Sequence, residues 1–179
     1  ILMITFSLIG TSGILCDSGN DMPIAVFPTK GAKTNAKLTL LQNPEEFPTD
    51  GIISWPGEYE IDGISLRGIG HEEGARVSFA MEMDDARCGF LSTPVLEWTD
   101  HELELLGDVD VLFIPAEKTK VAQKLIEQID PRVLIPILSE NKEDYDELLK
   151  VFGAQGQEVE KEFKLKGLPA EGRVVVVLG

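Results

Sequence analysis

The chain has 179 residues, of which 43% are hydrophobic and 26% charged, and its 31 acidic against 16 basic side chains give a net charge of −15. This size and composition fit one soluble globular domain, which we expect to cover residues 1–179. A chain this acidic repels phosphate backbones and anionic lipid headgroups, so we expect neither nucleic acid nor a membrane among its partners.

Two features of the sequence bear on the compartment. No stretch approaches the roughly 20 apolar residues that span a bilayer, and the apolar run at residues 1–15 lacks the basic segment of a signal peptide. The two cysteines, Cys16 and Cys88, lie far apart in sequence and fit neither a disulfide framework nor a zinc knuckle. We therefore expect a cytoplasmic protein with small, buried, reduced thiols.

Short strands dominate the first part of the sequence. Runs of β-prone residues, punctuated by Gly, Pro, Asn and Asp, predict strands at residues 4–9, 24–27, 37–41 and 51–54. These short runs and their turn residues are typical of a mainly antiparallel sheet.

The next elements also have the pattern of strands. Residues 58–61 and 64–69 flank Asp62-Gly63, and this dipeptide predicts a hairpin because both residues tolerate positive φ. Residues 76–83 alternate apolar and polar side chains, which predicts a half-buried strand. A pair of aspartates then turns the chain into a further strand at residues 87–91.

The second half of the sequence alternates strands with helices. Thr99 and Glu102 form a capping box, which predicts a short helix ending at Gly107. Apolar spacing predicts further helices, and continuous apolar runs predict buried strands. The expected helices cover residues 117–129 and 141–152, and the expected strands residues 109–114, 133–138, 162–166 and 173–178. A strand–helix–strand order of this kind predicts parallel pairing with the helices outside the sheet.

Three stretches together carry a resemblance to a known family. They are WPGEYEIDGI at residues 55–64, TDHEL at residues 99–103 with LGDVDVLFIP at residues 106–115, and IDPRVLIP at residues 129–136. Their order and spacing resemble the metallo-β-lactamase superfamily, in particular the small Zn-dependent hydrolases of the ascorbate-6-phosphate lactonase-like branch. The resemblance implies an α/β fold, a single-domain αββα sandwich of metallo-β-lactamase type.

The resemblance also implies zinc chemistry, for which this sequence lacks the ligands. The family holds two zinc ions with a His-x-His-x-Asp-His loop, a later His, a bridging Asp and a final His, and these ions generate a hydroxide nucleophile. Here the loop reads QNPEEF at residues 42–47 and contains no histidine. The later His matches His71, the bridging Asp matches Thr93, and the final His matches Leu138. With two histidines in the whole chain, we expect no metal, no other cofactor and no catalytic residue of the family's kind.

The same residues suggest a few further kinds of chemistry. A mononuclear metal site could combine His71 with Glu45, Glu46 or Glu72. Serine catalysis would draw on the hydroxyls of residues 11–12 or 92–93 with His71 as base, but the nucleophile-elbow pattern is absent. A Cys88–His71 thiol pair is weaker still, because Cys88 falls in an expected core strand.

The sequence thus predicts a degenerate, non-catalytic member of the family that serves as a binding or assembly module. We expect its remnant cleft to include His71, Glu72, Thr93 and Leu138, and to hold a small molecule or a loop of a protein partner. Family habit and exposed sheet edges favour a homo-oligomer. Two alternatives stay open: a hydrolase with a rebuilt site around His71 and Glu72, and a structural subunit that pairs with an active paralogue.

Overall fold

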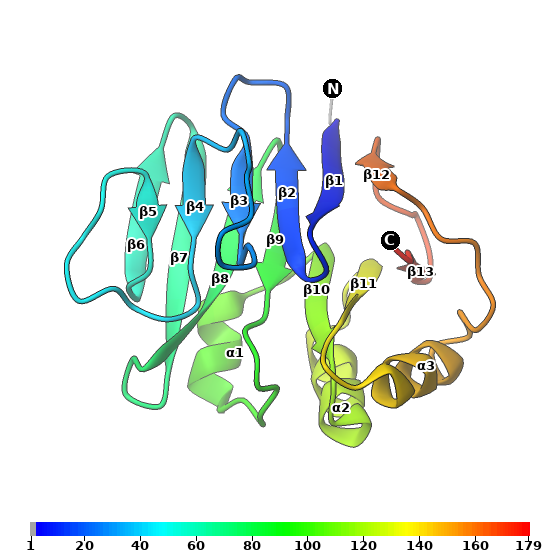
Figure 1. Cartoon of the computed structure of the whole chain (residues 1–179). Coiled ribbons are helices and arrows are strands. Elements are labelled where there is room, and N and C mark those ends of the chain that lie inside the picture. Colours follow the sequence, from blue (N-terminus) through cyan, green and yellow to red (C-terminus); the bar gives the residue numbers. More distant parts are fainter. Residues whose placement is uncertain (1–2) are drawn as a thin grey trace.

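A computed structural model of the chain describes residues 3–179. Two β-sheets stack face to face, and the helices lie on one side of the stack (Figure 1). The first sheet has six strands in the order β12-β1-β2-β3-β4-β5. Its strands are β1 (Ile4–Ile9), β2 (Gly13–Asp17), β3 (Ile24–Val26), β4 (Leu38–Leu40), β5 (Ile52–Ile53) and β12 (Glu162–Leu165).

The second sheet has seven strands in the order β13-β11-β10-β9-β8-β7-β6. Strands β6 to β9 pair antiparallel, whereas β9, β10, β11 and β13 pair parallel. Its strands are β6 (Gly57–Ile61), β7 (Ile64–His71), β8 (Arg76–Met83), β9 (Ala86–Phe90), β10 (Val111–Ala116), β11 (Val133–Leu138) and β13 (Val174–Val175).

Three helices pack against the second sheet. They are α1 (Asp100–Leu106) against β7, α2 (Thr119–Ile129) against β10, and α3 (Lys142–Val151) against β11. The capping box of α1 is confirmed, since the Thr99 side chain accepts from the Glu102 amide and the Glu102 carboxylate accepts from the Thr99 amide. None of the helices within residues 3–179 is long and apolar enough to cross a membrane.

The main core lies between the sheets. Phe113 on β10 stacks on Phe90 of β9 with ring centroids 4.8 Å apart, and it meets Phe6 of β1 at 5.1 Å. Cys16 and Cys88 are free thiols buried in the same core. Burial, together with the nearby Cys88, raises the pKa of Cys16 well above its ordinary value, and burial raises the pKa of Cys88 to about 12. The expectation of buried thiols is thus confirmed.

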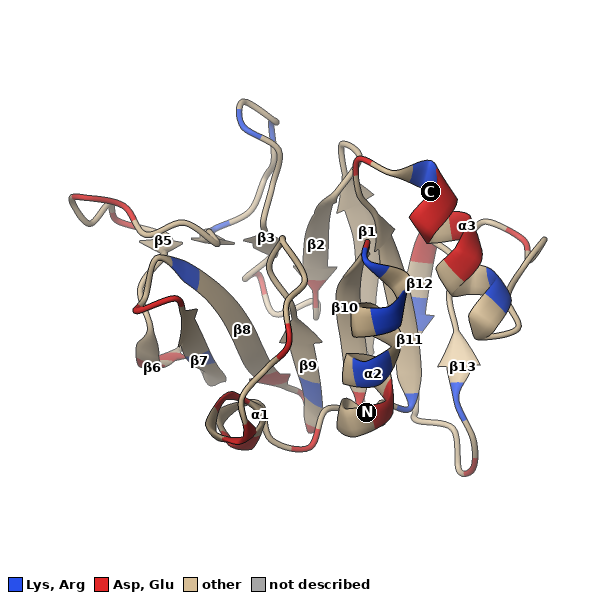
Figure 2. Cartoon of the chain, turned by 90° about the horizontal axis from the view of Figure 1, so that it is seen from below, with Lys and Arg blue, Asp and Glu red and all other residues tan. Residues whose placement is uncertain are grey.

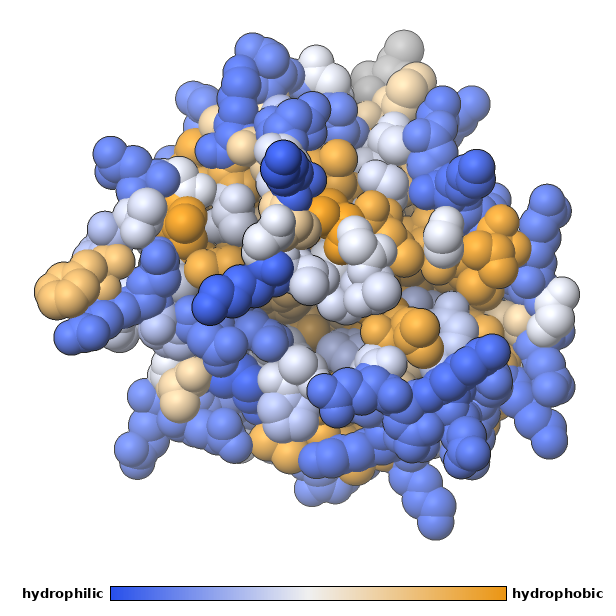
Figure 3. Space-filling view, viewed as in Figure 1, coloured by the Kyte–Doolittle hydropathy of each residue, from blue (hydrophilic) through white to orange (hydrophobic). Residues whose placement is uncertain are grey.

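The outer face of the first sheet, turned to the viewer in Figure 1, carries no helix of the described chain. In the same view, the space-filling surface shows apolar residues between many hydrophilic ones (Figure 3). The helices lie on the outer side of the second sheet, and the two sheets bury the main core between them.

Most expected elements are confirmed, and the differences concern β2, the pairing of the first sheet, β8, and the last strand, which covers only Val174–Val175 of the expected residues 173–178. The β6–β7 hairpin turns at Asp62 and Gly63 with φ of 48° and 81°. Strand β2, residues 13–17, is not among the predicted strands, because the glycines and hydroxyl residues before it favour a turn. The first sheet is antiparallel only in part: β3, β4 and β5 pair parallel. The loops between these strands, residues 27–37 and 41–51, are long enough to return the chain and start each strand in the same direction.

Strand β8 also differs from the expectation. The alternating pattern predicts a half-buried strand, but seven of its eight residues are buried. Of its polar residues only Glu82 faces solvent, since Arg76 and Ser78 lie in a buried hydrogen-bond network. Ala80, further along, packs in the cluster beneath α1 that includes Leu106.

Candidate functional site

A cleft of about 640 Å³ opens where β9, β10 and β11 end. Parallel strands gather their carboxyl ends at one edge of a sheet, and ligands commonly bind outside that edge. Apolar side chains from both sheets form the floor: Ile14, Phe27, Phe90, Phe113 and Ile137. The remaining apolar lining residues are Leu91, Pro94, Pro115 and the half-exposed Leu138. The polar lining residues are Thr11, Ser12, Gln42, Thr93, Glu117, Ser139 and Glu140.

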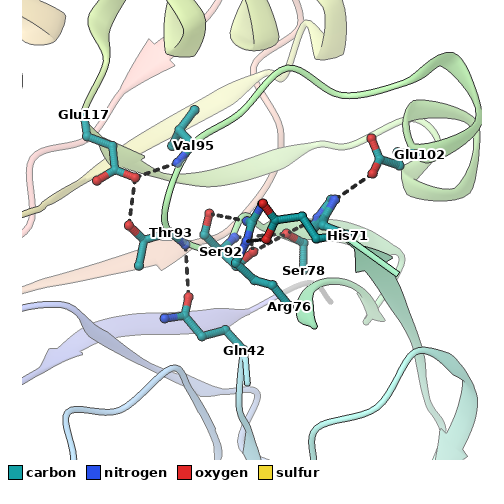
Figure 4. A network of polar contacts seen from close by, with 10 residues as sticks. Gln42, His71, Arg76, Ser78, Ser92, Thr93, Val95, Glu102 and Glu117 are labelled. Atoms are coloured by element: carbon teal, nitrogen blue, oxygen red, sulfur yellow. Dashed lines mark hydrogen bonds and ion pairs between the residues drawn. The ribbon is translucent and has the colours of Figure 1, made fainter. Parts of the chain in front are cut away.

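One wall of the cleft is the segment after β9, residues 92–95, which side chains hold from several directions (Figure 4). The Thr93 amide donates to Gln42 Oε1 at 3.0 Å. Glu117 Oε1 accepts from the Thr93 hydroxyl at 2.7 Å and from the Val95 amide at 2.6 Å. These hydrogen bonds tie the segment to the loop after β4 and to the end of β10.

Behind this wall lies a buried chain of hydrogen bonds (Figure 4). Arg76 Nη1 donates to Ser92 Oγ at 2.7 Å, and Ser92 Oγ lies 3.0 Å from Ser78 Oγ. Ser78 Oγ also lies 2.9 Å from His71 Nε2, and it accepts from the Ser92 amide at 3.0 Å. His71 Nδ1 lies 2.9 Å from Glu102 Oε1. The chain therefore runs from a guanidinium to a carboxylate through two hydroxyls and an imidazole.

One consistent direction of donation follows for a neutral imidazole that carries its proton on Nδ1. A guanidinium only donates and an ionised carboxylate only accepts. Ser92 then donates to Ser78, Ser78 donates to His71 Nε2, and His71 donates from Nδ1 to Glu102. This order requires a neutral imidazole. Burial lowers the pKa of His71, despite the opposing effect of the Glu102 carboxylate, and the nearby Arg76 charge adds to the lowering.

Glu102 is the charged acceptor at the end of the chain. Burial alone would raise the pKa of its carboxyl, but hydrogen bonds from His71 and Thr99 outweigh burial and lower it. Trp98 covers the imidazole, with ring centroids 4.6 Å apart. Glu102 thus serves both as the cap of α1 and as the partner of His71.

The neutral state of His71 predicts a pH dependence of stability. Histidine in the unfolded chain takes up a proton near pH 6.5, roughly, whereas folded His71 does so only at lower pH. Between these two values the unfolded chain binds more protons, so the free energy of unfolding falls as the pH is lowered. Urea unfolding measured at steps from about pH 7 to about pH 5 should show this loss, and His71→Asn should lack it.

The other histidine provides a matched control. His101 is exposed on α1, so His101→Asn should keep the pH dependence of the unsubstituted protein. The carboxyl pKa of Glu102 is lowered, so its stabilisation of the fold is present at neutral pH. This stabilisation is lost only in more acidic solution, below the ordinary range of glutamate. Equal pH profiles for His71→Asn and the unsubstituted protein would show that folded His71 is not held neutral.

The structure separates the four residues of the expected remnant cleft. Thr93 and Leu138 line the cleft. His71 is buried, and its two ring nitrogens contact Glu102 and Ser78. Glu72 is exposed and lies 3.8 Å from Arg76 Nε, so the structure does not pair His71 with Glu72.

Sequence reasoning misses the role of several polar residues in this region. In the sequence, Arg76 and Ser78 are only the polar side of an alternating strand, and Glu102 is only a helix cap. Gln42 begins the loop that lacks histidines, and Glu117 begins an expected helix. The sequence holds a signal only for Arg76 and Ser78, because the β7–β8 hairpin places these two polar residues beside His71.

Comparison with known proteins gives the family. The model of the "Beta-lactamase superfamily domain" matches residues 25–138, more than half of the chain. The chain belongs to this superfamily. The matched region contains strands β4 to β11, the segment 92–95 and His71, and so most of the cleft. No curated protein gives a significant match to this superfamily member.

Solved structures confirm the fold. A candidate Zn-dependent hydrolase of the metallo-β-lactamase superfamily from Thermotoga maritima has 19% identity and a TM-score of 0.81, over 97% of this chain and 98% of that one. The metallo-β-lactamase fold protein YhfI from Bacillus subtilis has 10% identity and a TM-score of 0.61, over 92% and 100%. The diiron β-hydroxylase CmlA from Streptomyces venezuelae has 9% identity and a TM-score of 0.59, over 90% of this chain and 54% of that one. At these identities the likeness extends to the fold alone.

The side chains near the cleft do not fit the two zinc ions of the family. Nowhere within residues 3–179 do three or more His, Cys, Asp or Glu side chains come close enough together to hold a metal ion. Glu45 Oε1 is buried without a hydrogen-bond partner, and it is the one atom of the 42–47 loop that resembles an unused ligand. The Arg76 guanidinium already brings a positive charge to His71 and Ser92, which opposes a dication there.

Serine and thiol chemistry meet different obstacles in the structure. Ser78, His71 and Glu102 have the order of nucleophile, base and carboxylate that serine hydrolases use. However, the Ser78 side chain is 0% exposed and Ser92 only 2% exposed. Cys88 lies in the core between the sheets, whereas both ring nitrogens of His71 contact other residues. The nucleophile–base–carboxylate order of a serine hydrolase is thus present, but a substrate cannot reach the buried serine.

Proposed function

We propose that this superfamily member is a non-catalytic binding module whose cleft holds a small molecule. One observation carries the proposal: His71, the histidine that matches a family ligand, uses both ring nitrogens within the protein. The cleft beside it is lined by hydroxyl, amide, carboxylate and apolar side chains, with no imidazole among the described residues. A concave, largely apolar site with a few polar groups is typical of small-molecule binding.

The residues that stand at the positions of the family's metal ligands support this proposal. Thr93, which matches the bridging Asp, has its hydroxyl bound to Glu117. Leu138, which matches the final His, offers no ligand atom and adds apolar surface to the cleft. The replacements keep the cleft open and make it less polar, which favours binding over hydrolysis.

Metal content of the purified, untagged protein tests the proposal. With zinc offered during purification, elemental mass spectrometry should find less than roughly a tenth of an equivalent of metal per chain. His71→Ala serves as the matched variant and should give the same low value. Near-stoichiometric zinc, iron or manganese that falls in His71→Ala would contradict the proposal and support a rebuilt metal site.

A hydrolase is the second candidate function, and it rests on the bonded order Ser78–His71–Glu102. Activity would require the segment 92–95 to move and expose Ser78. Ester hydrolysis by the unsubstituted protein that disappears in Ser78→Ala, while that variant stays folded, would favour a hydrolase. No hydrolysis above the background rate is expected.

Assembly and compartment remain proposals. Strands β5 and β6 form one pair of sheet edges, and β12 and β13 form the other. Unpaired edges can add a strand from a second copy, so a homo-oligomer fits the structure. Light scattering of the purified protein measures the oligomeric state. The absence of nucleic-acid partners and a cytoplasmic location stay predictions from charge and cysteine content.

A further inference from the structure

We infer that the cleft takes an organic cation, a primary ammonium group carried on an apolar body. This inference rests on the proposed function and names the chemical class of its ligand. Two features of the lining carry it: a floor that is apolar and partly aromatic, and charged groups that are all negative.

The floor of the cleft favours a ligand with an apolar body. Phe27, Phe90 and Phe113 contribute rings from both sheets, and Ile14 and Ile137 add aliphatic surface. At about 640 Å³ the cleft lies within the range, roughly 300–1,000 Å³, of small-molecule sites. An apolar ligand that covers this floor removes it from water, which stabilises the complex by about 25 cal/mol per Å² of apolar surface buried.

The charged residues of the lining favour a cationic ligand. Among the described residues that line the cleft, the ionisable side chains are Glu117 and Glu140, and none is basic. Both hydrogen bonds that hold the segment 92–95 to Glu117 go to Oε1, which leaves Oε2 for a ligand. Glu140 lies just before α3, whose first turn carries one basic residue, Lys142, and two acidic ones, Glu143 and Asp144 (Figure 2). An anionic ligand would be repelled by these carboxylates.

The remaining polar groups fit the geometry of an ammonium. It has three N–H donors and no acceptor. Thr11, Ser12 and Ser139 line the cleft, and a hydroxyl oxygen can accept alongside a glutamate. The aromatic rings of the floor also attract a cation placed over their faces. A bare metal ion would gain nothing from this floor.

Three probes of similar size separate charge from shape: phenethylammonium, phenethyl alcohol and phenylacetate. Each is titrated into the full chain, and binding is followed by NMR shifts of cleft residues. We expect phenethylammonium to bind about tenfold tighter than the alcohol, as a charge-assisted hydrogen bond allows, and phenylacetate to bind most weakly. Glu117→Gln keeps an oxygen for Thr93 and Val95, yet should remove the preference for ammonium.

Glu60→Gln is the matched control, because Glu60 is an exposed glutamate on β6 and does not line the cleft. It makes the same change in net charge and should leave the ammonium preference intact. If Glu60→Gln weakens ammonium binding as much as Glu117→Gln, the ligand is held by the overall field and the inference is overturned. Equal binding of ammonium and alcohol at the cleft also overturns it, but leaves the proposed function standing. If no probe shifts the cleft residues, the inference is overturned, whereas the proposed function is judged by the metal content of the protein.

Discussion

Replacing Ser78 with alanine is expected to lower the free energy of unfolding by about 2 to 6 kcal/mol, because it strands two buried polar groups at about 1–3 kcal/mol each. Ser78 Oγ lies 2.9 Å from His71 Nε2 and accepts from the Ser92 amide at 3.0 Å. Alanine removes the one oxygen that both groups share, in a place where the side chain is 0% exposed. Urea unfolding monitored by tryptophan fluorescence measures the change.

A second serine in the same sheet provides the control. Ser65 on β7 is exposed, so Ser65→Ala should change the free energy of unfolding by no more than about 0.5 kcal/mol. The contrast isolates the buried hydrogen bonds from the general effect of a serine-to-alanine change in a strand. Equal losses for the two variants would show that the chain from Arg76 to Glu102 contributes little to stability.

Replacing Phe113 with alanine should cost about 3–5 kcal/mol, the usual range for deleting a buried phenylalanine ring. Phe113 is 1% exposed and contacts rings on both sides: Phe90 in its own sheet and Phe6 in the facing sheet. The cavity would lie at the seam between the sheets and join the cleft floor. A loss of this size is a large part of the roughly 5–15 kcal/mol that stabilises a typical domain.

The control is a phenylalanine outside the core. Phe47 is 74% exposed, so Phe47→Ala should leave the midpoint of urea unfolding nearly unchanged. Phe113→Leu, which keeps much of the buried volume, should lose less than Phe113→Ala. If Phe113→Ala unfolds at the same urea concentration as Phe47→Ala, the two sheets are not held together at this point.

The order of elements could be predicted from the sequence where local chemistry decides it. Asp62-Gly63 determines a hairpin by its positive φ, and the Thr99–Glu102 capping box determines where α1 begins. Strand β11 runs over residues 133–138, the same bounds as expected. The parallel pairing of β3, β4 and β5 could not be predicted, because it depends on where long loops return the chain and no local residue encodes that.

The candidate site could be predicted only in part. Counting histidines suffices to show that the family's ligand set is incomplete, and Thr93 and Leu138 do line the cleft. The sequence could not show that His71 contacts Glu102, because 31 positions separate them and the contact forms only when α1 packs on β7. Nor could it show that Glu117 holds the segment 92–95, since that bond joins the ends of two neighbouring strands.

The two buried thiols make the unfolded chain, and not the folded one, sensitive to oxidation. In the fold, Cys16 and Cys88 are protonated at neutral pH and shielded by both sheets, so oxidants do not reach a thiolate. Once the sheets separate, each thiol regains its ordinary acidity and can be cross-linked or oxidised. Under oxidising conditions, unfolding would then become irreversible, and the lifetime of the protein would be set by how slowly its two layers part.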